Sequence, residues 1–429
     1  MYDKSLISEQ LLANLKIKRD SMRNEAFVAS QSILGEEGIE ALKYLYDLYD
    51  EKIYLWLAAL WEPEIGGFYF SNSGRDTEGF LPDIESTVQA IQFIGASGLR
   101  TFNYENNEEK IKQPILRFAK GLQDPDGYFY HPQWGKDISI SRRGRDLTWA
   151  CLIIKDYGGT FNYPTPLDKK EGEEKSDLLP EHLKATEKFC EYLEGLDIKN
   201  KSYSVGNLLQ AQISQIIAAG DEFVDILTKW YEANQNTENG TWSDKINYHA
   251  TNGLMKICLA YTAVGKEIPN ARLAMNSIVK VILSETPDSQ ITSFYNPWIT
   301  LKMILDNLNK FGNVELANQL RDDLVADAPM MIKRTADKVR NFRRDDGSYS
   351  YSPAGVCKAS QGAPVAYPLM PEGDINGNYL ATVGVVRNVC ITLGIPAVPL
   401  FCKEDGELFF KLIECSYASN KIYPKPVAN

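Results

Sequence analysis

The sequence predicts an all-α protein in which six or seven helical hairpins form a double-walled (α/α)6-7 toroid. First, a pattern recurs: a small residue, glycine, an aromatic residue, a polar loop and then a helix, as in residues 66–98, 126–159 and 239–265. Second, helices that are apolar on all sides alternate with helices that carry a single apolar stripe, which is typical of inner and outer layers. Third, strand-forming runs are confined to residues 66–71 and 347–352, so we expect only short β elements in the mouth loops.

The elements are expected to follow one another as parts of a single domain over residues 1–429. N-terminal helices occupy residues 1–61, hairpin repeats residues 62–400, and a C-terminal helix and tail residues 401–429. The apolar inner helices are expected to begin near Asp83, Asp146, Ser204, Tyr248, Ser293 and Asp374. The amphipathic outer helices are expected over residues 107–122, 181–195, 221–235, 266–284 and 312–328.

Two irregular stretches interrupt this alternation. Residues 166–182 are rich in Lys and Glu and are expected to form a solvated excursion on the outside. Residues 346–372 are rich in Gly, Pro, Ser and Tyr, and this loop is longer than loops usually are unless they have a role. We expect it to form a wall over the mouth that brings Glu372 and Asp374 to the edge of the cavity.

Composition excludes several classes of partner. The chain has 57 acidic and 46 basic residues, a net charge of −11, which argues against nucleic-acid binding. Its seven cysteines form no close pairs and there are only three histidines, so we expect free thiols, no metal site and no cofactor. It has no apolar run of about 18 residues and no secretory signal, which predicts a cytoplasmic protein without a membrane partner. We expect it to be a monomer or a small homo-oligomer.

The toroid would place a ligand site at one mouth of the barrel. The first turns of the inner helices would meet there, and each helix start has unpaired backbone N–H groups and the positive end of its dipole. The charged loops in front of these helices would line the cavity.

The recurrent glycine–aromatic motif followed by a helix with Thr/Asn-x-x-Ala resembles the α/α-toroid superfamily, from about Trp56 to about residue 400. That superfamily includes squalene and terpene cyclases, prenyltransferase β chains, and several polysaccharide-lyase and glycoside-hydrolase families. The resemblance concerns architecture and implies no single activity.

A terpenoid cyclase is one alternative that the resemblance raises. Residues 83–88, DIESTV, are similar to the acidic motif of class II cyclases, which would place the proton donor at Glu85. The surrounding loops hold many charges, which is unsuited to a hydrocarbon. An acid at Asp83 is also typical of a helix cap. A prenyltransferase zinc site is not expected, because His249 and Cys258 lie on one helix without a suitable Asp–Cys pair before them.

Carbohydrate chemistry fits the expected mouth better. Sugars are bound by aromatic faces together with planar hydrogen-bonding and charged side chains. The candidate substrate-binding residues in the loops are Tyr69, Arg75, Glu78, Trp134, Arg143, Arg145, Trp242, Glu372 and Asp374. Trp149 and Trp298, inside helices, are expected in the core.

Two carbohydrate-cleaving mechanisms are open. In β-elimination on a uronate, His249 and Tyr295 would transfer protons, and Asn247, Tyr248, Asn252 and Asn296 would help to bind the substrate. An Asn-x-His followed one hairpin later by a Tyr is similar to toroid polysaccharide lyases, which usually also place an Arg shortly before the Tyr. Here no Arg occurs between residues 273 and 320.

In hydrolysis, Glu85 or Asp83 would act with a second carboxyl group. The candidates for that second carboxyl group are Asp146, Asp244, Glu372 and Asp374. Elimination is our first hypothesis, and hydrolysis is the alternative. A terpenoid enzyme or a non-catalytic glycan-binding protein are the further alternatives.

Overall fold

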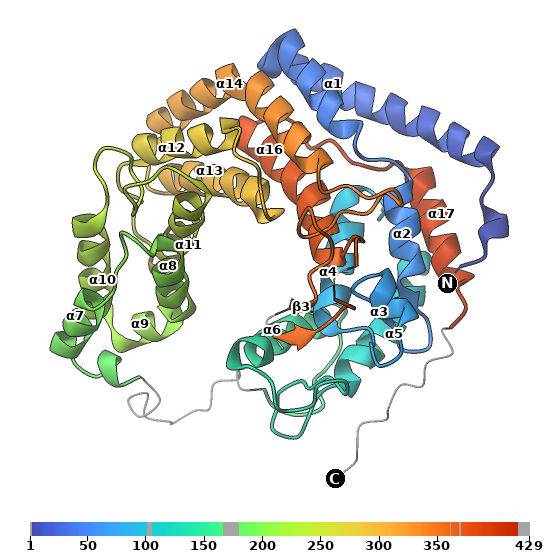
Figure 1. Ribbon diagram of the computed structural model, residues 1–429, viewed down its shortest axis with the longest axis horizontal. Coiled ribbons are helices and arrows are strands. Elements are labelled where there is room, and N and C mark those ends of the chain that lie inside the picture. Colours follow the sequence, from blue (N-terminus) through green and yellow to red (C-terminus); the bar gives the residue numbers. More distant parts are fainter. Residues whose placement is uncertain (1, 101–104, 166–179, 361, 369, 419–429) are drawn as a thin grey trace.

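The computed structural model describes residues 2–100, 105–165, 180–360, 362–368 and 370–418. This part of the chain is mostly helical, with two very small antiparallel sheets (Figure 1). Strand β1 (Trp61–Glu62) pairs with β2 (Gly67–Phe68), and β3 (Ala359–Ser360) pairs with β4 (Ala363–Pro364). The predicted all-α class with short β elements is confirmed.

The inner helices lie next to one another in a continuous row. They are α4 (Ile84–Ser97), α6 (Ile140–Asp156), α8 (Ser202–Ala211), α11 (Tyr248–Val264), α13 (Thr292–Lys310), α15 (Ile375–Tyr379) and α16 (Val385–Leu393). Contacts join them in the order α6, α4, α15, α16, α13, α11 and α8, and a π-helical segment (Leu380–Gly384) links α15 to α16.

A second set of helices covers this row on the outside, and Figure 1 shows the two sets following one curve. The outer helices are α1 (Glu9–Tyr46), α5 (Glu105–Gly121), α7 (Thr186–Glu194), α10 (Asp221–Asn234), α12 (Ala271–Leu283), α14 (Val314–Arg340) and α17 (Lys403–Glu414). Helix α2 (Lys52–Ala59) packs on the inner side of α17. Two short helices, α3 (Asn72–Asp76) and α9 (Ile213–Ala219), and 3-10 turns at Lys4–Leu6 and Glu181–Leu183 complete the described helices.

The predicted helical segments are confirmed, but several boundaries are shifted. Helix α12 begins at Ala271 instead of residue 266, and α14 continues to Arg340 instead of ending at residue 328. Five inner helices begin within two residues of the expected position, but α6 begins at Ile140, six residues before Asp146. The reason is Ser139, whose hydroxyl accepts the backbone N–H of Arg142 at 3.1 Å and caps the helix earlier. Asp146 therefore lies inside α6 instead of at its start.

The irregular stretches differ from the sequence prediction in detail. Residues 347–352 form no strand; Tyr349 makes only an isolated bridge to Arg343. Instead the second hairpin, β3–β4, lies within the long loop 346–372. Residues 166–179 of the predicted excursion and the C-terminal residues 419–429 lie outside the described residues.

Side-chain caps fix where three of the inner helices begin. Asp83, Asn247 and Asp374 precede α4, α11 and α15, and each accepts a backbone N–H from the first turn of its helix. A capping side chain satisfies N–H groups that have no partner within the helix. Below the caps the helices pack into one large apolar core, in which Trp298 is fully buried and Trp149 is partly buried.

Buried arginines attach the N-terminal helix to the rest of the molecule. Arg19 of α1 is 2% exposed and contacts Asp405 of α17 at 2.9 Å and Glu51 at 2.5 Å. Arg23 donates to the backbone carbonyls of Tyr49 and Leu400. The chain's beginning is therefore joined to its C-terminal part. Among the described residues, no helix is long and apolar enough to cross a membrane.

Candidate functional site

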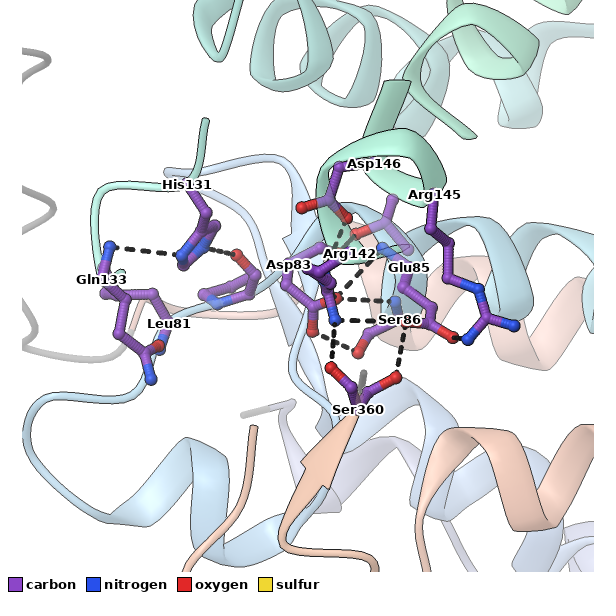
Figure 2. A network of polar contacts seen from close by, with 12 residues as sticks. Leu81, Asp83, Glu85, Ser86, His131, Gln133, Arg142, Arg145, Asp146 and Ser360 are labelled. Carbon is purple, nitrogen blue, oxygen red and sulfur yellow. Dashed lines mark hydrogen bonds and ion pairs between the residues drawn. The ribbon is translucent and has the colours of Figure 1, made fainter. Parts of the chain in front are cut away.

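A buried ion network joins the starts of α4 and α6 (Figure 2). The Arg142 guanidinium is fully buried, with Nη2 at 3.0 Å from Asp83 Oδ1 and Nη1 at 3.1 Å from Glu85 Oε2. Its Nε lies 2.9 Å from Asp146 Oδ1. This last contact is an ion pair between two atoms that have no well-directed hydrogen bond. One cation therefore holds three carboxyl groups.

Glu85 has partners on both carboxylate oxygens. Oε2 accepts the Ser360 hydroxyl at 2.7 Å in addition to Arg142, and Oε1 lies 3.2 Å from Arg145 Nη1. Ser360 belongs to β3, so the long loop 346–372 is tied to the network. Arg145 is 36% exposed and is the network's partly accessible group. Both oxygens of this buried side chain are therefore occupied by protein groups.

Asp83 acts as the cap of α4. Its Oδ1 accepts the backbone N–H groups of Glu85 at 3.0 Å and Ser86 at 3.2 Å, besides the contact with Arg142. It is 1% exposed. Because these donors surround a buried carboxylate, the capping role explains this residue, and the structure gives it no surface for a substrate.

Three buried groups have strongly shifted pKa values, and one of them, Asp146, belongs to the network. Burial raises the pKa of Asp146 to about 7, against the opposing effect of Arg142. Burial lowers the pKa of His131 to about 4. The neutral His131 ring fits its surroundings, because Nε2 donates to the Pro82 carbonyl at 2.8 Å and Nδ1 accepts the Gln133 N–H at 3.2 Å. Burial also raises the pKa of Asp374 to about 7.

A second polar group lies at the starts of α11 and α13. The Tyr248 hydroxyl is 2.5 Å from the Thr292 hydroxyl and 3.4 Å from Asn296 Nδ2. Asn296 Nδ2 also donates to Asn252 Oδ1 at 2.6 Å. The structure thus brings together three of the predicted substrate-binding residues, Tyr248, Asn252 and Asn296. Burial raises the pKa of Tyr248, so its phenol keeps its proton.

His249 is exposed and lines a pocket of 440 Å³ beside this group. Asn247 and Tyr248 line the same pocket from α11, and Lys280, Asp288 and Lys338 line it from the outer helices and the loop between α12 and α13. The volume is in the range of small-molecule sites. This pocket, called the His249 pocket below, is the accessible part of the candidate site.

Tyr295, the predicted partner of His249, lies elsewhere. It does not line the His249 pocket, and its ring packs against Gly384 in the π-helical segment. Burial raises the pKa of Tyr295 to about 12. Successive residues of a helix point about 100° apart, so Asn296 faces Asn252 while Tyr295 faces the next inner helix. The phenol that lines the His249 pocket together with His249 is that of Tyr248, and Tyr295 lies outside this pocket.

Several predicted binding residues form separate contacts. Arg75 makes a bidentate pair with its neighbour Asp76, both contacts 2.7 Å, and lines a different pocket of 650 Å³. Glu78 is exposed. The Arg143 guanidinium lies 5.0 Å from the ring centroid of Tyr128.

Trp134 belongs to the surroundings of the buried network. It stacks on His131 with ring centroids 4.0 Å apart, and the Arg142 guanidinium lies 4.8 Å from its ring. Its indole ring is thus covered on both sides by protein.

Besides Asn252 and Asn296, which are 7% and 6% exposed, four further residues expected to line the site are buried. Trp242 is fully buried and donates Nε1–H to the Tyr231 carbonyl at 2.7 Å, and Tyr69 is 1% exposed. Glu372 accepts hydrogen bonds from Ser71 and Ser73, and Asp374 is fully buried as a cap. The glycine–aromatic positions thus serve packing, and the two acids position the long loop.

Lys280 and Lys338 line the His249 pocket but are not among the residues predicted from the sequence. Both lie in amphipathic outer helices, where a lysine ordinarily faces solvent. Only the arrangement of α12 and α14 around the starts of α11 and α13 brings them to the His249 pocket.

Comparisons with models of known protein families, with curated proteins and with solved structures found no match to this chain.

Proposed function

We propose that this protein is a carbohydrate-active enzyme that cleaves an acidic, uronate-containing oligosaccharide or polysaccharide by β-elimination. The observation that carries the proposal is the His249 pocket, where an exposed imidazole and a partly buried, protonated phenol come from adjacent residues at the start of one inner helix. Elimination needs a base to remove the C5 proton and an acid to protonate the leaving oxygen.

The roles of the two side chains follow from their surroundings. His249 is open to the pocket and has no hydrogen bond among the described residues, so its ring is available to accept the C5 proton. As the C5–H bond breaks, a C4–C5 double bond forms and the C4–O bond breaks. The Tyr248 phenol returns a proton to the departing oxygen, with Thr292 as its hydrogen-bond partner.

Hydrolysis at Glu85 is the second candidate, and the ion pairs of Glu85 with Arg142 and Arg145 argue against it. A hydrolase needs one carboxyl group held protonated beside the scissile bond. Glu85 is 3% exposed, and both of its carboxylate oxygens are occupied by Arg142, Arg145 and Ser360, so neither is free to reach a scissile bond. Asp146 could hold a proton near neutral pH, but it is 2% exposed.

We further propose that the curved double layer is an (α/α) toroid, in which α6 and α8 close the ring. Contacts already connect all other neighbours of the inner row. Burial, and after it the charge of Arg145 on α6, lowers the pKa of Lys256 on α11. The electrostatic interaction between Arg145 on α6 and Lys256 on α11 supports a short distance between these two inner helices across the centre of the proposed ring.

The experiment is a panel of uronate-containing and neutral glycans, each incubated with the protein while ultraviolet absorbance and reducing ends are followed together. Elimination produces both signals, because the new double bond conjugates with the carboxylate. His249→Ala should abolish both, whereas His182→Ala, which changes a histidine outside the pocket, should abolish neither. New reducing ends without absorbance would contradict elimination and favour a carboxyl pair.

A further inference from the structure

The wall of the His249 pocket opposite the start of α11 carries two lysines. Lys280 lies near the end of α12 and is exposed, and Lys338 lies near the end of α14 with its side chain 12% exposed. Both line the pocket together with His249 and Tyr248. The two positive charges therefore reach the pocket from two different helices, α12 and α14.

Lys338 is incompletely satisfied by its protein partners. Its Nζ lies 3.3 Å from Asp288 Oδ2 and donates a long hydrogen bond of 3.4 Å to the Val281 carbonyl. Asp288 Oδ2 is buried and has no hydrogen bond. The pair therefore touches as an ion pair without a directed bond. An ammonium group has three N–H donors, so Lys338 keeps donors for another acceptor.

The charges around the pocket do not cancel. Among the described residues that line the pocket, Asp288 is the only acidic one, and it faces two lysines, Lys280 and Lys338. The starts of α11 and α13 add the positive ends of two long helix dipoles, of which α11 has only part of its first-turn N–H groups capped by Asn247. A local excess of positive charge in a chain of net charge −11 indicates an anionic ligand.

Hydroxyl groups surround these cations. Ser284, Ser289 and Ser293 line the pocket beside the lysines. Lysines supply charge, and serine hydroxyls supply both donors and acceptors to a ring that carries hydroxyl groups. The combination suits a small hydroxylated acid better than a bare inorganic anion.

We propose that Lys338 and Lys280 bind the carboxylate of a uronate residue in the His249 pocket, with Lys338 as the main contact. This inference rests on the proposed function for the identity of the sugar. It assigns to lysines the charge neutralisation that makes the C5 proton more acidic. It also explains how the site can lack an arginine between residues 273 and 320. Asp288 holds Lys338 in place and competes with the substrate's carboxylate for it.

Direct binding tests the assignment without requiring catalysis. Galacturonate, glucuronate, glucose and glucose 6-phosphate are titrated calorimetrically into the full chain. We expect a uronate to bind at least about tenfold more tightly than glucose, and Lys338→Met to remove that preference. Lys280→Met should reduce it by a smaller factor. Lys333→Met, which removes an exposed lysine from the same helix α14, should leave it unchanged.

A second pair of variants guards against a change in folding. Asp288→Asn removes the competing carboxylate and should strengthen uronate binding several-fold. The double variant Asp288→Asn/Lys338→Met leaves no unpaired buried charge and should still show no preference for uronates. Unchanged thermal midpoints would confirm that both variants are folded.

The outcomes separate the two proposals. If Lys338→Met keeps the uronate preference, or if only glucose 6-phosphate binds, the carboxylate assignment is overturned even where elimination is observed. If the preference depends on Lys338 but no uronate glycan gives an unsaturated product, the binding site stands and the proposed reaction fails.

Discussion

Replacing Arg142 by methionine should destabilise the protein severely. The substitution keeps an unbranched side chain of comparable length but removes the cation that contacts Asp83, Glu85 and Asp146 within 3.1 Å. All three carboxyl groups are at most 3% exposed. Removing one partner of a buried ion pair costs about 3–5 kcal/mol, because the remaining charge is buried without compensation. We expect a loss in that range at neutral pH.

The loss should become smaller in acid. Removing Arg142 removes the main influence that lowers the pKa of Asp146, so burial keeps this carboxyl group protonated to a higher pH in the folded variant. The folded variant then binds more protons than the unfolded chain, so its stability relative to the wild type recovers as the pH falls below neutrality. At about pH 5 the difference from the wild type should be clearly smaller than at neutral pH.

The assay is urea unfolding followed by tryptophan fluorescence, with Arg143→Met as the matched control. Arg143 is the next residue in the chain and lies over the Tyr128 ring, a contact worth about 0.5–1 kcal/mol at an accessible site. If the free energy of unfolding of Arg142→Met stays within about 1 kcal/mol of that of Arg143→Met, the network does not hold α4 and α6 together as described.

Three further predictions concern pH, the backbone and the long loop. The free energy of unfolding should fall by about 3 kcal/mol as the pH falls from 6.5 toward 4, because the pKa of His131 is about 4 in the folded protein and 6.5 ordinarily. His131→Asn should lack this pH-dependent loss, and an equal loss in the variant would refute the assignment. Gly240→Ala should lower the free energy of unfolding by at least about 2 kcal/mol, since a Cβ at this position would lie 2.3 Å from the Ala274 nitrogen. Gly265→Ala should lower it by about 1 kcal/mol, because Gly265 has a similar positive φ but no atom within 4 Å of its Cβ position. Equal losses for the two variants would contradict the packing around Gly240. Ser360→Ala should destabilise by about 1–3 kcal/mol through the lost bond to Glu85, measured by urea unfolding, and protease cleavage within residues 346–372 should become faster.

The helices were predictable because their signals are local. Inner and outer helices differ in how apolar residues are spaced, and caps such as Asp83 and Asp374 stand directly before the helices that they cap. The start of α6 was misplaced because serine and aspartate are about equally good N-caps, so the local sequence does not decide between Ser139 and Asp146.

The site was only partly predictable because burial depends on the tertiary arrangement. The sequence places Tyr248, Asn252 and Asn296 correctly on helix starts that meet, since their spacing on α11 and α13 fixes the faces that they share. It cannot show that Trp242 is fully buried or that Lys338 reaches the His249 pocket, because both depend on how distant helices pack.

The most direct test of the central claim is the mass of the products formed from a uronate-containing oligosaccharide in heavy-oxygen water. β-Elimination at His249 and Tyr248 breaks the C4–O bond without adding water. The two products should therefore sum to the mass of the substrate, carry no heavy oxygen, and fail to form with His249→Ala. Products that together contain one added water with heavy oxygen at the new reducing end would show hydrolysis and contradict the account.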